Sequence, residues 1–303
     1  MAVSMWRVCC VLSAFACFVA PALAGNRYPV VLVHGFGGWS KSELGGYKYW
    51  GGKRDYEQEL RAQGYDVYIA NIGKLSSNWD RTCELFAQIK GGRVDYGANH
   101  SATRGHNRYG ETYAGLVPRW GDMVNGTLQK VHIIGHSMGG STARMLSQLL
   151  LKGTKGAPIE EDPSSHVLFA GGHDWIHSIT TISTPHQGAT SADALSKNGD
   201  LVKDFVAALV VLLGVPGDGY TQFFDAKLDQ WGVDPRKPTE SVPEDLNQVL
   251  SSAVLKPGFK DIVLWSLSTA GAKEEATWVK NHDSIFYYSY SNKDTVPSCQ
   301  EQK

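Results

Sequence analysis

The chain has 303 residues, of which 42% are hydrophobic and 19% charged, and these proportions are typical of a globular protein rather than a disordered or fibrous one. Its 29 basic and 30 acidic residues give a net charge of −1, which excludes a strong electrostatic attraction to nucleic acid or to an anionic membrane. The length suits one large α/β domain or two small ones.

The first 24 residues have the parts of a secretory signal peptide. Arg7 provides a positive charge, an apolar run follows over residues 8–19, and Ala22-Leu23-Ala24 forms a cleavage site of the A-x-A type. The run is short for a membrane span. We therefore predict cleavage after Ala24, secretion, no transmembrane segment in the remaining chain, and a single domain over residues 25–303.

After cleavage, Cys83 and Cys299 would remain, so at most one disulfide could form. Two glycosylation sequons begin at Asn99 and Asn125, and they matter only in a host that glycosylates secreted proteins.

The first predicted strand covers residues 28–33 and ends at His34-Gly35-Phe36. In α/β-hydrolases, a strand that ends in His-Gly supplies one backbone N–H of the oxyanion hole. That donor would be Phe36, although an ordinary strand-to-loop turn is the alternative. A helix over residues 55–63 and a strand over residues 65–70 are expected next.

The central motif is Gly135-His136-Ser137-Met138-Gly139, which fits the G-x-S-x-G nucleophile elbow. An apolar, β-branched run precedes it from Val131, and an amphipathic helix is expected over residues 141–151. The motif therefore has the strand, turn and helix that it needs. We predict Ser137 as the nucleophile and the N–H of Met138 as the second oxyanion donor.

Strands and helices continue to alternate up to a strand over residues 176–182, which predicts a mostly parallel sheet covered by helices on both faces. The strongly apolar residues 200–213 predict a helix that is either buried in the core or a mobile lid over an apolar cleft. His186 follows the strand at 176–182, and packing at the strand end is the commoner reading. A last strand is expected over residues 285–290.

A second group of residues has the chemistry of a zinc site: Asp80, His100, His106 and Asp229. Two imidazoles and two carboxylates make a closed ligand set that cancels the charge of Zn²⁺. The spacing alone does not bring these residues together, so surface aspartates and loop histidines remain the alternative.

Several stretches resemble one family, the secreted zinc-containing lipases of the thermoalkalophilic Geobacillus and staphylococcal type. The matching stretches include Leu32–Trp39, Lys48–Gly52, Leu75–Asp80, Val94–Ala98, His132–Gly140 and Lys227–Gly232. The resemblance implies an α/β-hydrolase fold with a zinc-pinned insertion and a helical lid at residues 200–213. It also implies Ser137 as the nucleophile, Phe36 and Met138 at the oxyanion hole, and Asp80, His100, His106 and Asp229 as ligands of a structural Zn²⁺.

The resemblance also implies that the catalytic acid and histidine, and most of a calcium site, lie beyond residue 303. We therefore expect a C-terminally incomplete fold, with Ca²⁺ only in a full-length form. Asp294 is a weak local candidate for the acid, and His34, His136, His186 and His282 are the remaining candidates for a recruited base. The expected function is hydrolysis of lipid esters through a serine acyl-enzyme, and the alternative is an inactive, zinc-binding lipid binder.

Overall fold

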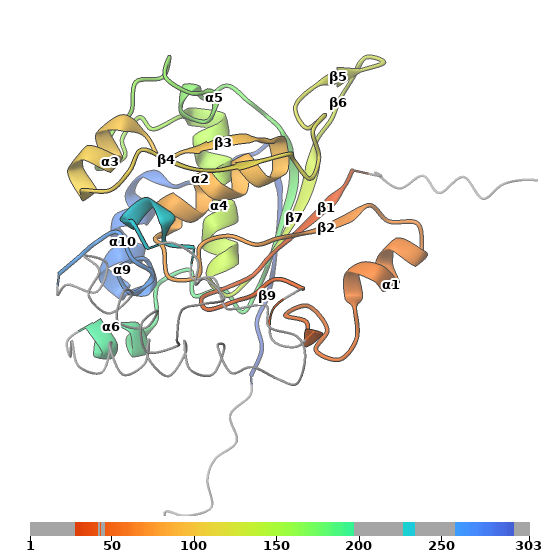
Figure 1. The fold of residues 1–303 in the computed structure, drawn as a ribbon, viewed down its shortest axis with the longest axis horizontal. Coiled ribbons are helices and arrows are strands. Elements are labelled where there is room, and N and C mark those ends of the chain that lie inside the picture. The colour runs from red at the N-terminus through yellow and green to blue at the C-terminus, as the bar shows by residue number, and fades with distance from the viewer. Residues whose placement is uncertain (1–27, 42, 44–45, 197–226, 234–257, 294–303) are drawn as a thin grey trace, which may run out of the picture.

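The computed structural model describes residues 28–41, 43, 46–196, 227–233 and 258–293. A sheet of five strands forms its centre, in the order β2-β1-β7-β8-β9, and every neighbouring pair is parallel (Figure 1). The strands are β1 (Val30–Val33), β2 (Val67–Ala70), β7 (Val131–His136), β8 (Ile176–Ile182) and β9 (Phe286–Tyr290). The predicted mostly parallel α/β sheet is confirmed.

The sequence of the central strands explains their place in the sheet. Along β7, burial alternates residue by residue, so that Val131, Ile133 and Gly135 are buried while the residues between them are partly exposed. The register sets Ile133 beside Val31 on one side and beside Ile179 on the other. All three side chains are fully buried and belong to the main apolar core.

Helices surround the sheet. They are α1 (Tyr56–Ala62), α2 (Asn78–Lys90), α3 (Ala98–Arg104), α4 (Met138–Lys152), α5 (Val167–Ala170), α6 (Thr190–Ser196), α9 (Val263–Leu267) and α10 (Thr269–Trp278), with the 3-10 turn η2 (Asp229–Trp231). Asp55 and Ser77 cap α1 and α2, because each side chain accepts a hydrogen bond from a backbone N–H of the first turn. Helices α2 and α4 contact each other through the core.

Two short antiparallel ribbons complete the described fold. Strand β3 (Gly92–Asp95) pairs with β4 (Tyr109–Tyr113), and the connection between them contains α3. Strand β5 (Met123–Val124) pairs with β6 (Thr127–Leu128) in a hairpin that projects from the body of the molecule (Figure 1). Of the two predicted histidine ligands, His100 lies in α3 and His106 lies between α3 and β4.

Some sequence predictions fall outside the described residues. They are the signal peptide at residues 1–24, the lid at residues 200–213, Asp294 and Cys299. Cys83 lies in α2 and is buried, and burial raises the pKa of its thiol well above the usual value. Within the described part of the chain, every helix is too short or too polar to cross a bilayer.

The start of α4 lies unusually close to β1. A Cβ atom added at Gly139 would lie 2.2 Å from the carbonyl oxygen of Val33, so only glycine fits at this contact. We expect Gly139→Ala to lower the free energy of unfolding by about 1–3 kcal/mol, because the added methyl group must push two backbones apart. Urea unfolding would measure the change.

Ser141→Ala is the matched control, because Ser141 lies two residues along the same helix and is only half-buried. It should change the stability by less than about 0.5 kcal/mol. Equal stability of the two variants would contradict the close approach of α4 to β1.

Candidate functional site

Ser137 occupies the turn between β7 and α4, with φ 53° and ψ −127°. Few residues other than glycine adopt this backbone conformation, and such strain is typical of functional sites. Two hydrogen bonds of 2.8 Å hold the turn: the Ser137 N–H donates to the carbonyl of Ile182, and the Thr184 hydroxyl donates to the carbonyl of Ser137. The strand, sharp turn and helix predicted around Ser137 are therefore present.

The loop after β1 lies directly against this turn. A Cβ atom at Gly35 would be 2.7 Å from the Cβ of Ser137. The neighbouring His34 is fully buried, with Nδ1 2.8 Å from the carbonyl of Gly35 and Nε2 accepting the N–H of Ile72 at 3.2 Å. This arrangement fits a neutral imidazole, and burial holds the pKa of His34 well below its usual value. His34 therefore shapes the loop rather than serving as a base.

The two predicted oxyanion residues, Phe36 and Met138, lie next to the turn at Ser137. Phe36 follows Gly35 in the loop, and Met138 follows Ser137 at the start of α4. Met138 is fully buried in a second apolar cluster, and the half-buried Phe36 packs against that cluster. The structure thus brings Ser137, Phe36 and Met138 to one place.

Tyr49 is a residue of this site that the sequence reasoning did not single out. Its hydroxyl accepts the N–H of Gly35 at 2.9 Å and lies 2.5 Å from Nδ1 of His136. Burial raises the Tyr49 pKa, so the phenol stays protonated and can donate to His136. The Tyr-Trp-Gly-Gly stretch that contains it was one of the family-like segments, and this was the available signal.

The described residues place no histidine in hydrogen-bond contact with the Ser137 hydroxyl. Among the candidates for a recruited base, His136 bonds to Tyr49, and Nε2 of His186 lies 3.2 Å from the hydroxyl of Thr181. The reading of His186 as a residue packed at a strand end agrees with this contact.

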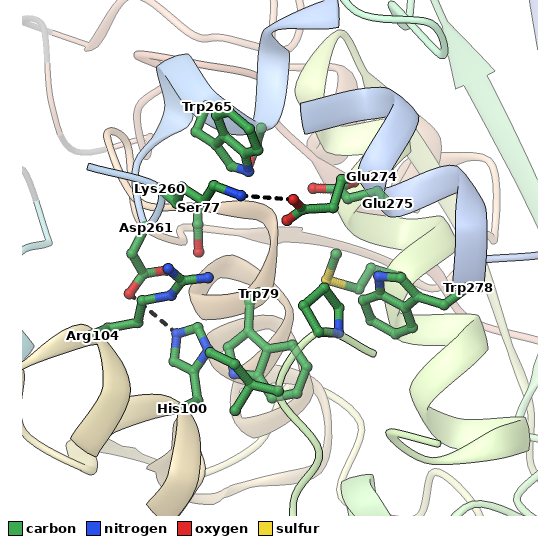
Figure 2. A pocket seen from close by; sticks show the side chains of 14 residues that line it. Ser77, Trp79, His100, Arg104, Lys260, Asp261, Trp265, Glu274, Glu275 and Trp278 are labelled. Carbon is green, nitrogen blue, oxygen red and sulfur yellow. Dashed lines mark hydrogen bonds and ion pairs between the residues drawn. The ribbon is translucent and has the colours of Figure 1, made fainter. Parts of the chain in front are cut away.

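A second constellation lies at the N-terminal end of α2, where Asp80, His100, His106 and Asp261 bring their ligand atoms within 4.8 Å of one another. Nε2 of His100 is 3.1 Å from Oδ2 of Asp261 and 3.3 Å from Oδ1 of Asp80. Nε2 of His106 is 3.2 Å and 3.9 Å from the same two oxygens. Figure 2 shows His100 and Asp261 facing each other.

These separations fit the edges of a metal-centred tetrahedron. Ligand bonds of about 2.0–2.1 Å place the ligand atoms of a tetrahedral site about 3.3 Å apart. The side chains are at most 4% exposed, yet Oδ1 of Asp80 and Nε2 of His106 have no hydrogen-bond partner. Since buried polar atoms without partners are costly, the group can hold a metal ion that satisfies them.

The pKa shifts of His100 and Asp261 also favour binding of a cation. Burial opposes a charge on His100, but the carboxylates of Asp261 and Asp80 together outweigh it and raise the His100 pKa to about 9. Burial opposes a charge on Asp261 too, and the two imidazoles outweigh it and hold the Asp261 pKa below its usual range. Without an ion, the two carboxylates therefore draw protons onto the imidazoles. A divalent cation would replace those protons.

Aromatic and amide side chains support the ligands from behind. Trp79 stacks on His100 with ring centres 4.9 Å apart, and Trp231 lies 4.6 Å from the ring of His106. Nε2 of Gln230 donates to Oδ2 of Asp80 at 2.9 Å. Such contacts fix the orientation of metal ligands.

The prediction of Asp229 as the fourth ligand needs correction, because the described structure places Asp261 in that position. The turn η2 does reach the group, but it presents Gln230 to Asp80. Asp229 instead directs Oδ2 to within 3.3 Å of where a Cβ on Gly110 would lie. The family-like Lys227–Gly232 stretch therefore identified a supporting segment and not the ligand.

Asp261 carries only a weak sequence signal, that of a lone carboxylate directly before the apolar run Ile262–Leu264. It is 1% exposed in the structure. Beside it, a hollow of about 60 Å³ opens between α3 and α10, and Trp79, Trp265 and Trp278 line it (Figure 2). Ser137 does not line this hollow, so the metal group and the elbow are separate sites.

Comparison with known proteins gives a consistent picture. The family described as "Lipase-like, C-terminal domain" matches residues 26–303. Lipase 1 of Staphylococcus aureus (strain NCTC 8325 / PS 47) is 39% identical over 280 residues, which are 89% of this chain and 39% of the relative. The chain thus spans well under half the length of this curated relative.

Two solved structures are also similar. Lipase 1 from Pelosinus fermentans is 48% identical with a TM-score of 0.78, and the match covers 90% of this chain and 70% of that one. EstA from Clostridium botulinum is 43% identical with a TM-score of 0.73, over 87% of this chain and 60% of that one. The resemblance drawn from the sequence is confirmed, and the chain belongs to the lipase-like C-terminal domain family.

Proposed function

We propose that the protein is a serine hydrolase that cleaves carboxylic esters of lipids, with Ser137 as the nucleophile. The observation that carries this proposal is the strained turn at Ser137, with φ 53°, set between a parallel strand and a helix and against Gly35. The lipase names of the relatives at 39% and 48% identity favour hydrolysis over a non-catalytic lipid binder.

The chemistry follows from the positions of the groups. The Ser137 hydroxyl attacks the ester carbonyl carbon and passes its proton to a general base. The N–H groups of Phe36 and Met138 stabilise the negative oxygen of the tetrahedral intermediate. The alcohol leaves with a proton, and water then hydrolyses the acyl-enzyme to release the fatty acid.

This mechanism needs only the backbone N–H of Met138, whose side chain packs in the second apolar cluster. The reaction also requires a general base and an acid that orients it. The described residues do not supply either group to Ser137. Within the described part of the chain we assign the nucleophile and the oxyanion donors, and turnover also requires the base and the acid.

For the metal group we propose a structural Zn²⁺ held by Asp80, His100, His106 and Asp261. When bound, the ion would supply cross-linking rather than catalysis, because four protein ligands leave no open position for substrate. Those ligands come from α2, α3, the loop after α3 and the segment before α9. Zinc would thus join segments that are up to 181 residues apart in sequence.

We further propose that the protein is secreted and acts at a lipid–water interface. The arrangement of charge, apolar run and cleavage site in residues 1–24 supports export.

The nucleophile can be tested with a fluorophosphonate probe on intact, purified protein. We expect one probe per molecule, attached at Ser137, and complete loss of labelling in Ser137→Ala. Ser141→Ala is the control, since it removes a nearby hydroxyl of the same helix and should label normally. Ester turnover in Ser137→Ala should fall by about a million-fold where the whole protein is active. Labelling that persists in Ser137→Ala would contradict the assignment.

The fourth zinc ligand can be tested by comparing Asp261→Asn with Asp229→Asn. We expect Asp261→Asn to weaken zinc binding by at least about 100-fold, because it removes a charged ligand from a buried site. Asp229→Asn should bind zinc within a few-fold of the wild type. Competition with a chromogenic chelator would measure both affinities, and the reverse order would restore Asp229 as the ligand.

A further inference from the structure

Arg81 follows the metal-group residue Asp80 in the first turns of α2 and is completely buried. Such a buried charge requires partners for its donors. Its partners are not carboxylates. Nη2 donates to the carbonyl of His34 at 2.5 Å, Nη1 donates to the carbonyl of Gly73, and Nε donates to the hydroxyl of Thr142 at 3.1 Å.

The first of these contacts holds the loop after β1. His34 lies two residues before Phe36, and its carbonyl is where the chain leaves the sheet. Gly73 lies in the loop after β2, and the N–H of Gly37 donates to the carbonyl of the next residue, Lys74, at 3.1 Å. The guanidinium therefore bridges the Phe36 loop and the neighbouring loop, and the backbone hydrogen bond from Gly37 to Lys74 is a second tie between them.

The third contact reaches the other oxyanion residue. The Thr142 hydroxyl accepts from Arg81 and lies 3.1 Å from the carbonyl of Met138, to which it can donate. Thr142 is fully buried one turn along α4. One planar side chain thus holds both segments that carry the oxyanion donors, and it does so through rigid, fully buried contacts.

We infer that Arg81 is a positioning residue for the oxyanion hole, in which it fixes the loop of Phe36 relative to the first turn of α4. This inference rests on the proposed ester hydrolysis for its catalytic consequence, but the positioning itself is a property of the fold.

The test compares Arg81→Met, Arg81→Lys and Thr142→Val in the full chain by hydrogen exchange and mass spectrometry. In Arg81→Met, amide exchange should accelerate about tenfold or more in residues 35–38 and in residues 138–142, with strand β7 unchanged. In Thr142→Val, which has nearly the same shape without the hydroxyl, exchange should accelerate only in residues 138–142. Arg81→Lys keeps the charge with fewer donors and should fall between the wild type and Arg81→Met.

Ester hydrolysis provides the second readout. Arg81→Met should lower kcat about 10–100-fold with little change in KM, because misplaced donors weaken transition-state binding more than substrate binding. Exchange that stays unchanged in both segments, or that rises equally in β7, would overturn the inference. If Arg81→Met does not fold, the selective effect of Thr142→Val decides it, together with exchange in Arg81→Lys that is faster than in the wild type in residues 35–38 and 138–142 but not in β7. Absence of hydrolysis in the wild type, together with the expected exchange pattern, would refute the proposed function and leave the positioning role standing.

Discussion

The first turn of α2 is the constraint on which both sites depend. Asp80 and Arg81 are adjacent there, and both are fully buried. Successive residues of a helix point about 100° apart, so one side chain can face the metal group while the other faces the loop of His34. Burial lowers the Arg81 pKa to about 10, which still leaves the guanidinium charged at neutral pH. Losing one hydrogen bond to a buried charged group costs about 1.5–3 kcal/mol, so this turn tolerates little displacement.

The second apolar cluster extends that constraint to the nucleophile. Met138 packs in it with Leu75, Leu228, Ile262 and Val263. Leu228 precedes the turn η2 that supports Asp80, and Ile262 follows Asp261 directly. The segments that complete the metal group are therefore the ones that cover the start of α4. A structural ion would fix the backbone to which these apolar side chains belong. It would thereby stabilise the packing around Met138 at the start of α4 without touching substrate.

Local patterns in the sequence predicted most of the fold and the elbow. The strands at residues 131–136 and 176–182, the turn at Ser137 and the helix after it follow from β-branched runs, glycine spacing and helical periodicity. Asp261 could not be predicted in this way, because its role depends on contacts with residues 155 or more positions away and no local pattern encodes them. Tyr49 and Arg81 were missed for the same reason. Each matters through contacts with other segments, so their residue types alone carry no signal beyond the family-like stretch that contains Tyr49.

The error at Asp229 shows how a correct segment can yield a wrong residue. The Leu228–Gly232 stretch does pack against the metal group, but its 3-10 turn presents an amide to Asp80. A carboxylate at that point would face Asp80 and add a third negative charge beside the two from Asp80 and Asp261. The amide of Gln230 can instead donate to Asp80 while the oxygen on the other side of the carboxylate faces the imidazoles. Gln230 therefore supports the Asp80 carboxylate from this turn, and Asp261 provides the second carboxylate of the group.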